Sequence, residues 1–522
     1  MELLKQNIHM DRVCREGSTQ ISLEDDMNLP ETKPDISSLC MEKGSVVIEE
    51  VRPGADAVSV RGRLIFSVLY HTQEEGSRLV CAEGKILFEE KIRMEGLSST
   101  DSVTVSGEVE DLTVGVINSR KLSVQSVIAL NAFVEEIYDE EIPVGVSCPG
   151  DNREAVQYRQ TPMDLTQVAM CKKDVLRVKE EIALPAGYPN INQILWKSVE
   201  PGEMSFRLGE EKLYVQGDLR VFVMYEGEGE SPSVQIVEST VPMTAEIACS
   251  GCREGMAPDI RYQLGQWELT PRPDLDGEQR VFGLELPIDL RICVYEEKNV
   301  NLITDIYGVT QEICGEKKTV ELERLLRCVT GRTRVADHVK LPDGSKVLQL
   351  VRSEAKANVT NVQTTEEGIL IRGNVAVKAL YITDDDEKPY QCMRAVLPFE
   401  YTLEIPGMKE GEKPGRIQTN LEQLSVTMLD GEEMDVKAVV CFSTTALCKV
   451  SAEVIHEIAE YPLDSEKLSA LPSMAIYVVK PKDNLWDIGK RYYVPVQSLM
   501  ELNELNSQEV SPGQKILIVK GV

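Results

Sequence analysis

The chain has 522 residues, a length that at roughly 100–200 residues per domain corresponds to about three to five domains. Acidic side chains outnumber basic ones by 86 to 56, so the formal net charge is −30, which argues against a protein that binds nucleic acid or an anionic membrane surface. Because 42% of the residues are hydrophobic, the chain can form packed cores and is not a disordered acidic tail.

The N-terminal segment, residues 1–12, lacks the apolar stretch of a secretory signal. The most apolar stretch, residues 436–450, contains lysine and three hydroxyl residues and falls short of the ~20 apolar residues that a membrane span needs. The thirteen cysteines are odd in number and have no regular spacing, which predicts buried thiols in a reducing compartment. We therefore expect a cytoplasmic protein.

A pattern of about 155 residues occurs three times in the first 460 residues. In each copy a glycine within a β-branched segment is followed eight residues later by a tyrosine and 26 residues later by a large apolar residue. The glycines are Gly62, Gly217 and Gly373, the tyrosines are Tyr70, Tyr225 and Tyr381, and the apolar residues are Phe88, Met243 and Phe399. Agreement at this many fixed offsets indicates a true internal repeat.

The repeat has the chemistry of β-structure. Apolar residues alternate around each glycine, and a glycine in mid-strand indicates a bulge or a close backbone approach. Twenty-six residues before each glycine, an apolar i, i+3, i+4 step begins at Ile36, Ile191 or Val347, which predicts one helical turn per copy. We predict a mainly β fold with three sandwich-like domains, residues 1–160, 161–318 and 319–462, then a linker, 463–473, and a small module, 474–522.

The repeats contain few groups that could do chemistry. Histidine occurs four times and never at a repeated position, which excludes a repeated metal or histidine-based site. The pair Cys249 and Cys252 is better explained by buried thiols than by zinc or redox chemistry, and the acidic run 384–387 by a solvated turn than by a Ca²⁺ loop. The repeated tyrosines fit core packing better than ligand stacking. No nucleotide-binding or hydrolase motif is present, so we expect no catalytic residues, cofactor or metal.

The last fifty residues follow a different pattern, strand–helix–helix–strand. A strand over 476–479 leads through a turn to a helix that starts at Leu485, with Asn484 as its cap and Asp487 three residues later. Pro495 opens a second helix, and residues 515–519 form the closing strand. The module has a net charge of +1 on a chain of −30. Trp486, next to the inward Leu485, is expected to be at least half exposed.

This module resembles a LysM domain in the segments 477–488, 499–503 and 512–518. The resemblance implies a shallow groove for N-acetylglucosamine-containing glycans, lined by Lys482, Asp483 and Asn484 on one side and Asn506, Ser507 and Gln508 on the other. Lys482 and Asn484 stand where the family commonly has glycine and threonine. Trp486 is either a helix residue lying over the module's own surface or an aromatic anchor for a partner. Asn503 fits a structural hydrogen-bonding role better than a ligand contact.

The repeats are similar to the SPOCS domains of clostridial sporulation proteins, through the segments 34–36 and 189–191 and the glycine–tyrosine strands that follow them. Three such units before a LysM domain resemble spore-coat morphogenetic proteins. The resemblance implies a non-enzymatic scaffold in the mother-cell cytoplasm at the forespore surface. Its LysM domain would bind the ATPase of the coat basement layer. The alternative is a peptidoglycan or cortex glycan-binding protein, and a hydrolase is the least favoured class.

Overall fold

The structure is a computed structural model that describes residues 1–73, 78–148, 155–229, 233–341, 346–385, 387–408, 417–430, 432–464, 469 and 471–520. Parts of the predicted linker 463–473, one residue of the acidic run 384–387 and the last two residues of the module lie outside these ranges. Strands make up most of the described chain, which confirms the predicted mainly β fold.

The strands form three groups, here called unit 1, unit 2 and unit 3. Unit 1 contains β1 (Glu2–Asn28), β2 (Ile36–Pro53), β3 (Ala57–Thr72), β4 (Leu79–Arg93), β5 (Val103–Asn118) and β6 (Lys121–Ser147). Unit 2 contains β7 (Val156–Ala183), β8 (Ile191–Pro201), β9 (Ser205–Gly209), β10 (Lys212–Gly227), β11 (Val234–Ala248), β12 (Ala257–Leu264), β13 (Glu268–Pro273) and β14 (Gln279–Gly308). Unit 3 contains β15 (Glu312–Lys340), β16 (Val347–Thr365), β17 (Gly368–Thr383), β18 (Tyr390–Glu404), β19 (Gln418–Asp430) and β20 (Glu433–Tyr461).

Each unit is a sandwich of two antiparallel sheets. In unit 1 the sheet β2-β3-β4 packs on the sheet β1-β6-β5. Unit 2 repeats this plan with β8-β10-β11 on a sheet in which β14 pairs with β7 on one side and with β12 and β13 on the other. Unit 3 repeats it with β16-β17-β18 on β15-β20-β19. The two sheets of unit 1 bury a common core that includes Phe66 from β3 and Ile128 from β6, and each of the other units has a separate core of the same kind. The sandwich prediction is confirmed.

The repeated glycines and apolar residues are cross-strand partners. Gly62 pairs with Phe88, and the glycines of units 2 and 3 pair in the same way with the residue 26 positions later. A Cβ on Gly62 would lie 2.6 Å from the ring of Phe88, so the ring requires the missing side chain. The repeated tyrosines are fully buried, and the hydroxyl of Tyr70 donates to the carbonyl of Pro34 at 3.0 Å. Core packing is therefore their role, as predicted.

The predicted helical turns are wrong, because the segments that carry them are strands with two β-bulges. In unit 1 the pairing of β2 with β3 skips one residue after Ile36 and another after Leu39. The strands β8 and β16 skip residues at the equivalent places. Each bulge adds a residue and changes which face the following side chains occupy, so apolar residues recur at i, i+3 and i+4 in an extended chain.

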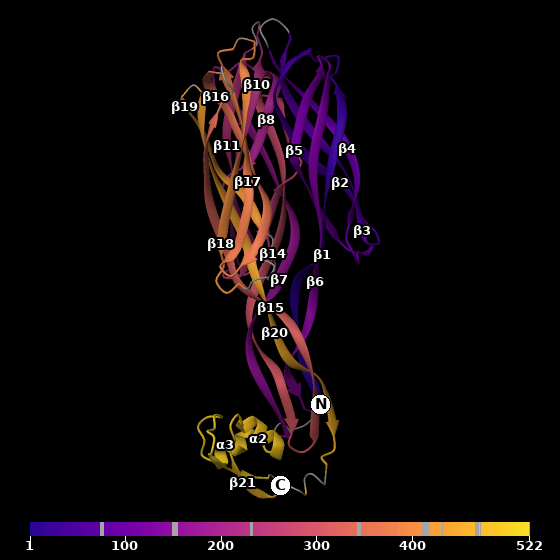
Figure 1. Ribbon diagram of the computed structural model, residues 1–522, viewed down its shortest axis with the longest axis vertical. Coiled ribbons are helices and arrows are strands. Elements are labelled where there is room, and N and C mark those ends of the chain that lie inside the picture. Colours follow the sequence, from indigo (N-terminus) through magenta and orange to yellow (C-terminus); the bar gives the residue numbers. More distant parts are fainter. Residues whose placement is uncertain are drawn as a thin grey trace.

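The first and last strands of each unit are twice as long as a sandwich needs, and their outer halves form a stalk (Figure 1). We define the stalk as residues 2–14, 135–147, 156–169, 295–308, 312–326 and 447–461. A bulge separates it from the sandwich in every unit, at Cys14, Ala169 and Leu326. The stalk core takes three residues from each unit: Ile8, Met10, Ile142, Leu165, Val300, Leu302, Val320, Leu322 and Val454.

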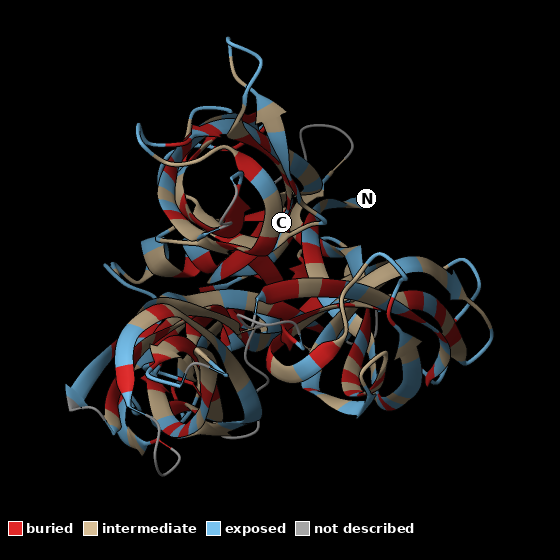
Figure 2. Cartoon of the chain, turned by 90° about the horizontal axis from the view of Figure 1, so that it is seen from above, coloured by how far each residue is buried: buried red, intermediate tan, exposed pale blue. Residues whose placement is uncertain are grey.

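The three sandwiches surround a common axis, as the view along the long direction of the molecule shows (Figure 2). A second shared core joins their facing sheets, with Met41 from unit 1, Trp196 from unit 2 and Leu380 from unit 3. Glu42, 3% exposed, accepts a hydrogen bond from Lys378 of unit 3 at 2.8 Å. The units are therefore not strung out along the chain but close on one another.

The cysteine prediction holds in part. Cys249 and Cys252 are buried and unpaired in the turn between β11 and β12, as expected of core thiols. Cys171 and Cys293, however, are joined by a disulfide between the paired strands β7 and β14. The sequence could not indicate this bond, because their separation of 122 residues becomes adjacency only through the register of the two strands.

Candidate binding surfaces of the C-terminal head

The C-terminal module, here called the head, has the predicted strand–helix–helix–strand order. It contains β21 (Met474–Val478), α2 (Leu485–Tyr492), α3 (Val496–Leu502) and β22 (Lys515–Val519). Asn484 caps α2, since its side-chain oxygen accepts from the backbone N–H of Asp487 at 2.8 Å. Asn503 donates to the carbonyls of Leu499 and Leu517 at 2.8 Å each, which confirms its structural role.

The first predicted groove side uses its polar groups mainly within the head. The carboxylate of Asp483 accepts from the hydroxyl of Tyr477 at 2.5 Å and from the backbone N–H of Lys480 at 2.9 Å. These two hydrogen bonds, in that order of importance, lower the pKa of Asp483. Asn484 is the helix cap. Lys482 adopts a left-handed backbone with φ of 76°, which explains why a glycine suits this position, and its side chain is exposed.

The second predicted groove side has free polar groups. Asn506, Ser507 and Gln508 lie in the loop between α3 and β22, and all three are exposed. Within the described part of the chain, none of their side chains has a hydrogen-bond partner within the protein. The C-terminal end of this loop reaches the end of β21, where Val479 exchanges backbone hydrogen bonds of 2.9 and 2.8 Å with Gln514 and Gly513. This loop is therefore the part of the predicted groove best able to receive a ligand.

The outward face of the head's two-stranded sheet is apolar except for one lysine. Met474, Ile476 and Val478 alternate along β21 and are 63%, 67% and 51% exposed. On the paired strand β22, Leu517 lies opposite Ile476, Val519 lies opposite Met474, and the exposed Lys515 lies opposite Val478. Clustered apolar side chains on a strand pair that carries no acidic residue are typical of a protein-docking surface. This face was not predicted, although its period-2 alternation is visible in the sequence.

The prediction that Trp486 is at least half exposed is wrong, because it is 8% exposed. Its indole packs edge-on against the ring of Tyr307, with ring centroids 4.9 Å apart, and its N–H donates to Asp305 at 2.7 Å. Both partners lie at the end of β14 on the stalk, where the head rests (Figure 1). A contact between residues 181 positions apart lies beyond local sequence patterns.

The carboxylate of Asp305 is the polar centre of this contact. It accepts from Trp486 and also from the ammonium group of Lys490 at 2.6 Å. Burial by itself would raise the pKa of Asp305, but the hydrogen bonds from Lys490 and Trp486 outweigh it and hold the pKa below its usual value. The hydroxyl of Tyr307 completes the contact by donating to the carbonyl of Val494 at 2.9 Å.

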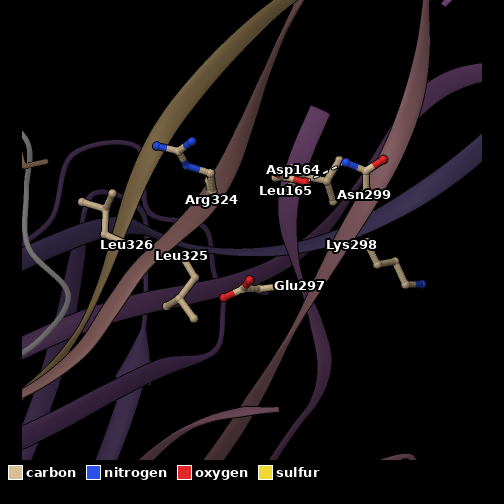
Figure 3. Close-up of a pocket in the computed structure, with 8 residues that line it drawn as sticks. All are labelled: Asp164, Leu165, Glu297, Lys298, Asn299, Arg324, Leu325 and Leu326. Carbon is tan, nitrogen blue, oxygen red and sulfur yellow. Dashed lines mark hydrogen bonds between the residues drawn. The ribbon is translucent and has the colours of Figure 1, made fainter. Parts of the chain in front are cut away.

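A cavity of about 520 Å³ lies away from the head, between β7, β14 and β15 (Figure 3). Its lining residues are Asp164, Leu165, Glu297, Lys298, Asn299, Arg324, Leu325 and Leu326. Asn299 donates to Asp164 at 2.7 Å, while Lys298 extends away from the other side chains (Figure 3). The cavity therefore lacks converging acid, base or nucleophilic groups.

In the part of the chain that the structure describes, no helix is both long and apolar enough to cross a membrane. No group of three or more histidine, cysteine or acidic side chains is arranged there to hold a metal ion.

Comparison with known families agrees with this architecture. The family model for the SipL SPOCS domain matches residues 35–117, 190–271 and 346–429, one match in each unit. These ranges run from β2 to β5, from β8 to β13 and from β16 to β19, so they leave out the long strands that build the stalk. The LysM family model matches residues 477–519, which comprise the head. Neither is an enzyme family.

Among curated proteins, the "Uncharacterized protein YkzQ" of Bacillus subtilis (strain 168) is 49% identical to this chain over 43 residues. The match covers 8% of this chain and 57% of YkzQ. No solved structure matches the chain. The three SPOCS matches and the C-terminal LysM match together identify the chain as a SipL-like protein.

Proposed function

We propose that this protein is a non-enzymatic scaffold in bacterial spore-envelope assembly. It would act in the mother-cell cytoplasm at the forespore surface, where its head would dock to the ATPase of the coat basement layer. The three SPOCS domains support the place in sporulation, and the two matched families support a binding role.

The observation that carries the docking proposal is the exposed apolar face of Met474, Ile476 and Val478. A glycan-binding groove recognises sugar hydroxyls through polar groups, and it does not require a strand whose outward side chains are all apolar. A protein partner, in contrast, gains free energy by covering such side chains, roughly in proportion to the apolar area removed from water. The head therefore carries a surface that suits a protein.

Glycan binding is the second candidate, and a separate observation favours it. The LysM match covers the loops that contain Asn506, Ser507 and Gln508, and these three polar side chains are exposed and free to bind sugar. On this alternative the protein would recognise N-acetylglucosamine-containing polymers of peptidoglycan or cortex. Lys482, Asp483 and Asn484 would form the opposite side of the groove.

The two functions can be separated with one set of full-length variants. Ile476→Thr keeps a β-branched residue in the strand but makes the apolar face polar, and it should weaken capture of the purified coat ATPase at least tenfold. The matched control Val396→Thr, at a 64% exposed position of β18, should leave capture unchanged. A triple alanine variant at 506–508 should bind the ATPase normally.

Sedimentation with purified peptidoglycan tests the alternative. If the wild-type chain sediments, if chitin oligomers release it and if the triple variant at 506–508 stays in solution, the head is a glycan-binding domain. The docking proposal would be contradicted if Ile476→Thr and Val396→Thr captured the ATPase equally well.

A further inference from the structure

A β-bulge gives the stalk a surface that faces the head. Near the end of β14 the pairing with β7 shifts between Ile303 and Asp305. Ile303 and Ile306 both point into a second apolar cluster of the stalk, with Val156, Ile313 and Ile455, which an unbroken strand could not achieve with residues three apart. The shift turns Asp305 and Tyr307 toward the head, in the way that bulges commonly redirect side chains at functional positions.

Helix α2 presents two different faces at helical spacing. Leu485 and Ile488 point into the head's own core. Trp486, Gly489 and Lys490 form the other face, since residues three and four apart lie side by side on a helix. A Cβ on Gly489 would lie 2.7 Å from the hydroxyl oxygen of Tyr307, so the glycine allows the tyrosine to approach the helix.

The contact joins groups that differ in chemistry and that complement one another. The stalk supplies a carboxylate, Asp305, for the indole N–H and the ammonium group of the head. It also supplies Tyr307, which is 3% exposed and whose ring meets the Trp486 indole edge-on. The guanidinium group of Arg159 lies 5.7 Å from the centroid of the indole ring. The apolar cluster of the head includes Tyr307 and Val309 of this region.

We propose that the end of the stalk is a docking surface for the tryptophan face of α2 and that the docked head is a latch. The docking surface consists of Arg159, Asp305, Tyr307 and Val309. While the head is docked, the Trp486 face is closed to other proteins, whereas the 506–508 loop and the outward sheet face remain open. Release of the head uncovers the Trp486 face.

The remaining structure is consistent with a detachable contact. The head reaches the stalk through a separate segment, residues 462–473, and its core contains eight buried aliphatic residues of its own: Val479, Leu485, Ile488, Val494, Val496, Leu499, Ile516 and Ile518. The head therefore supplies most of its own core, and Tyr307 is the buried residue that the stalk adds to it. This inference concerns a contact within the chain and does not rest on the identity of the outside partner.

Fluorine NMR of the full chain labelled with 5-fluorotryptophan tests the latch. The chain has three tryptophans, so three resonances are expected, and Trp486→Phe identifies the one from Trp486. In the wild-type protein this resonance should show little change when H₂O is replaced by D₂O, because the indole is covered. Tyr307→Ala alters only the stalk and should shift this one resonance and increase its solvent-isotope effect severalfold.

Two further variants grade the effect and control for misfolding. Tyr307→Phe removes only the hydroxyl that donates to Val494 and should give a smaller increase. Tyr158→Ala, at a 40% exposed tyrosine on the neighbouring strand β7, should leave all three resonances in place. Unchanged resonances from Trp196 and Trp267 show that the sandwich of unit 2, which carries Tyr307, remains folded. The latch is overturned if the wild-type Trp486 resonance already has a large isotope effect, or if Tyr307→Ala leaves that resonance unchanged.

Discussion

The sandwiches and the stalk are built from the same long strands but are stabilised differently. Each sandwich buries a core that belongs to one unit, whereas the stalk core takes three residues from each of the three units. A sandwich can therefore be expected to persist when its neighbours open, but the stalk requires all three units at once. Because the head rests on the stalk, the position of the head depends on this shared core.

The largest effect should come from a sandwich core and should stay local. Phe442 is fully buried in unit 3, where it packs against the rings of Phe399 and Tyr401 with centroid distances of 5.6 and 5.5 Å. Phe442→Ala should lower the free energy of unfolding by about 4 kcal/mol. Hydrogen exchange should rise in β16 to β19 and stay low in β2 to β4. Faster exchange in all three sandwiches would contradict separate cores.

A slightly smaller but more widespread effect is expected in the stalk. Leu302 of unit 2 is 1% exposed and shares its core with Ile8 of unit 1 and Leu322 of unit 3. Leu302→Ala should cost about 3 kcal/mol, because it leaves a cavity between the three units. Hydrogen exchange should increase in the stalk segments of β1, β7 and β15 together. An increase confined to β7 and β14 would show that the units do not share this core.

The sequence predicted the sandwiches better than the stalk, and the reason is physical. The offset of 26 residues between Gly62 and Phe88 reflects a hairpin whose two strands pair directly, so local spacing contains the contact. The bulges after Ile36 and Leu39 imitate helical spacing, because only the partner strand shows that a residue has been skipped. The stalk core depends on three segments about 150 residues apart, and no local pattern records that they meet.

The head shows the same limit. The caps Asn484 and Asn503 were predicted correctly, since each bonds to residues within the head. The exposure of Trp486 was predicted wrongly, because Tyr307, the residue that covers it, belongs to unit 2. The groove residues Lys482, Asp483, Asn484, Asn506, Ser507 and Gln508 stay a prediction. A sequence pattern can identify such a surface side chain but not what lies over it.

A smaller, pH-dependent effect should belong to the stalk alone. Burial raises the pKa of Glu323 to about 7, the nearby carboxylate of Asp11 adds to the shift, and Lys449 opposes it. The folded chain therefore holds this proton to higher pH than the unfolded chain does. The contribution of protonated Glu323 to the free energy of unfolding is fully present below the usual pKa of 4.5 and is lost as the pH rises to about 7. After allowance for solvent screening, this loss lowers the free energy of unfolding by roughly 2 kcal/mol.

Glu323→Gln tests this assignment, because a neutral amide has no proton to lose. Urea unfolding of the variant between pH 4.5 and 7.5 should show a weaker fall in stability with rising pH than the wild-type chain shows. Glu321→Gln, at an exposed position two residues away, is the matched control and should keep the wild-type pH dependence. Identical pH profiles for Glu323→Gln and the wild-type chain would remove Glu323 as the source.

The smallest effect should come from the ion pairs that cross between units in the stalk. Lys318 of unit 3 lies 3.0 Å from Glu140 of unit 1, and the two side chains are 49% and 22% exposed. An ion pair open to solvent gains little, since water and salt screen it, so Lys318→Met should cost less than about 1 kcal/mol. Lys179 pairs with Glu285 within the sandwich of unit 2, and the two side chains are 67% and 46% exposed, so Lys179→Met should have a similarly small effect. If Lys318→Met instead cost as much as Leu302→Ala and the loss disappeared in high salt, charge rather than the shared apolar core would join the units.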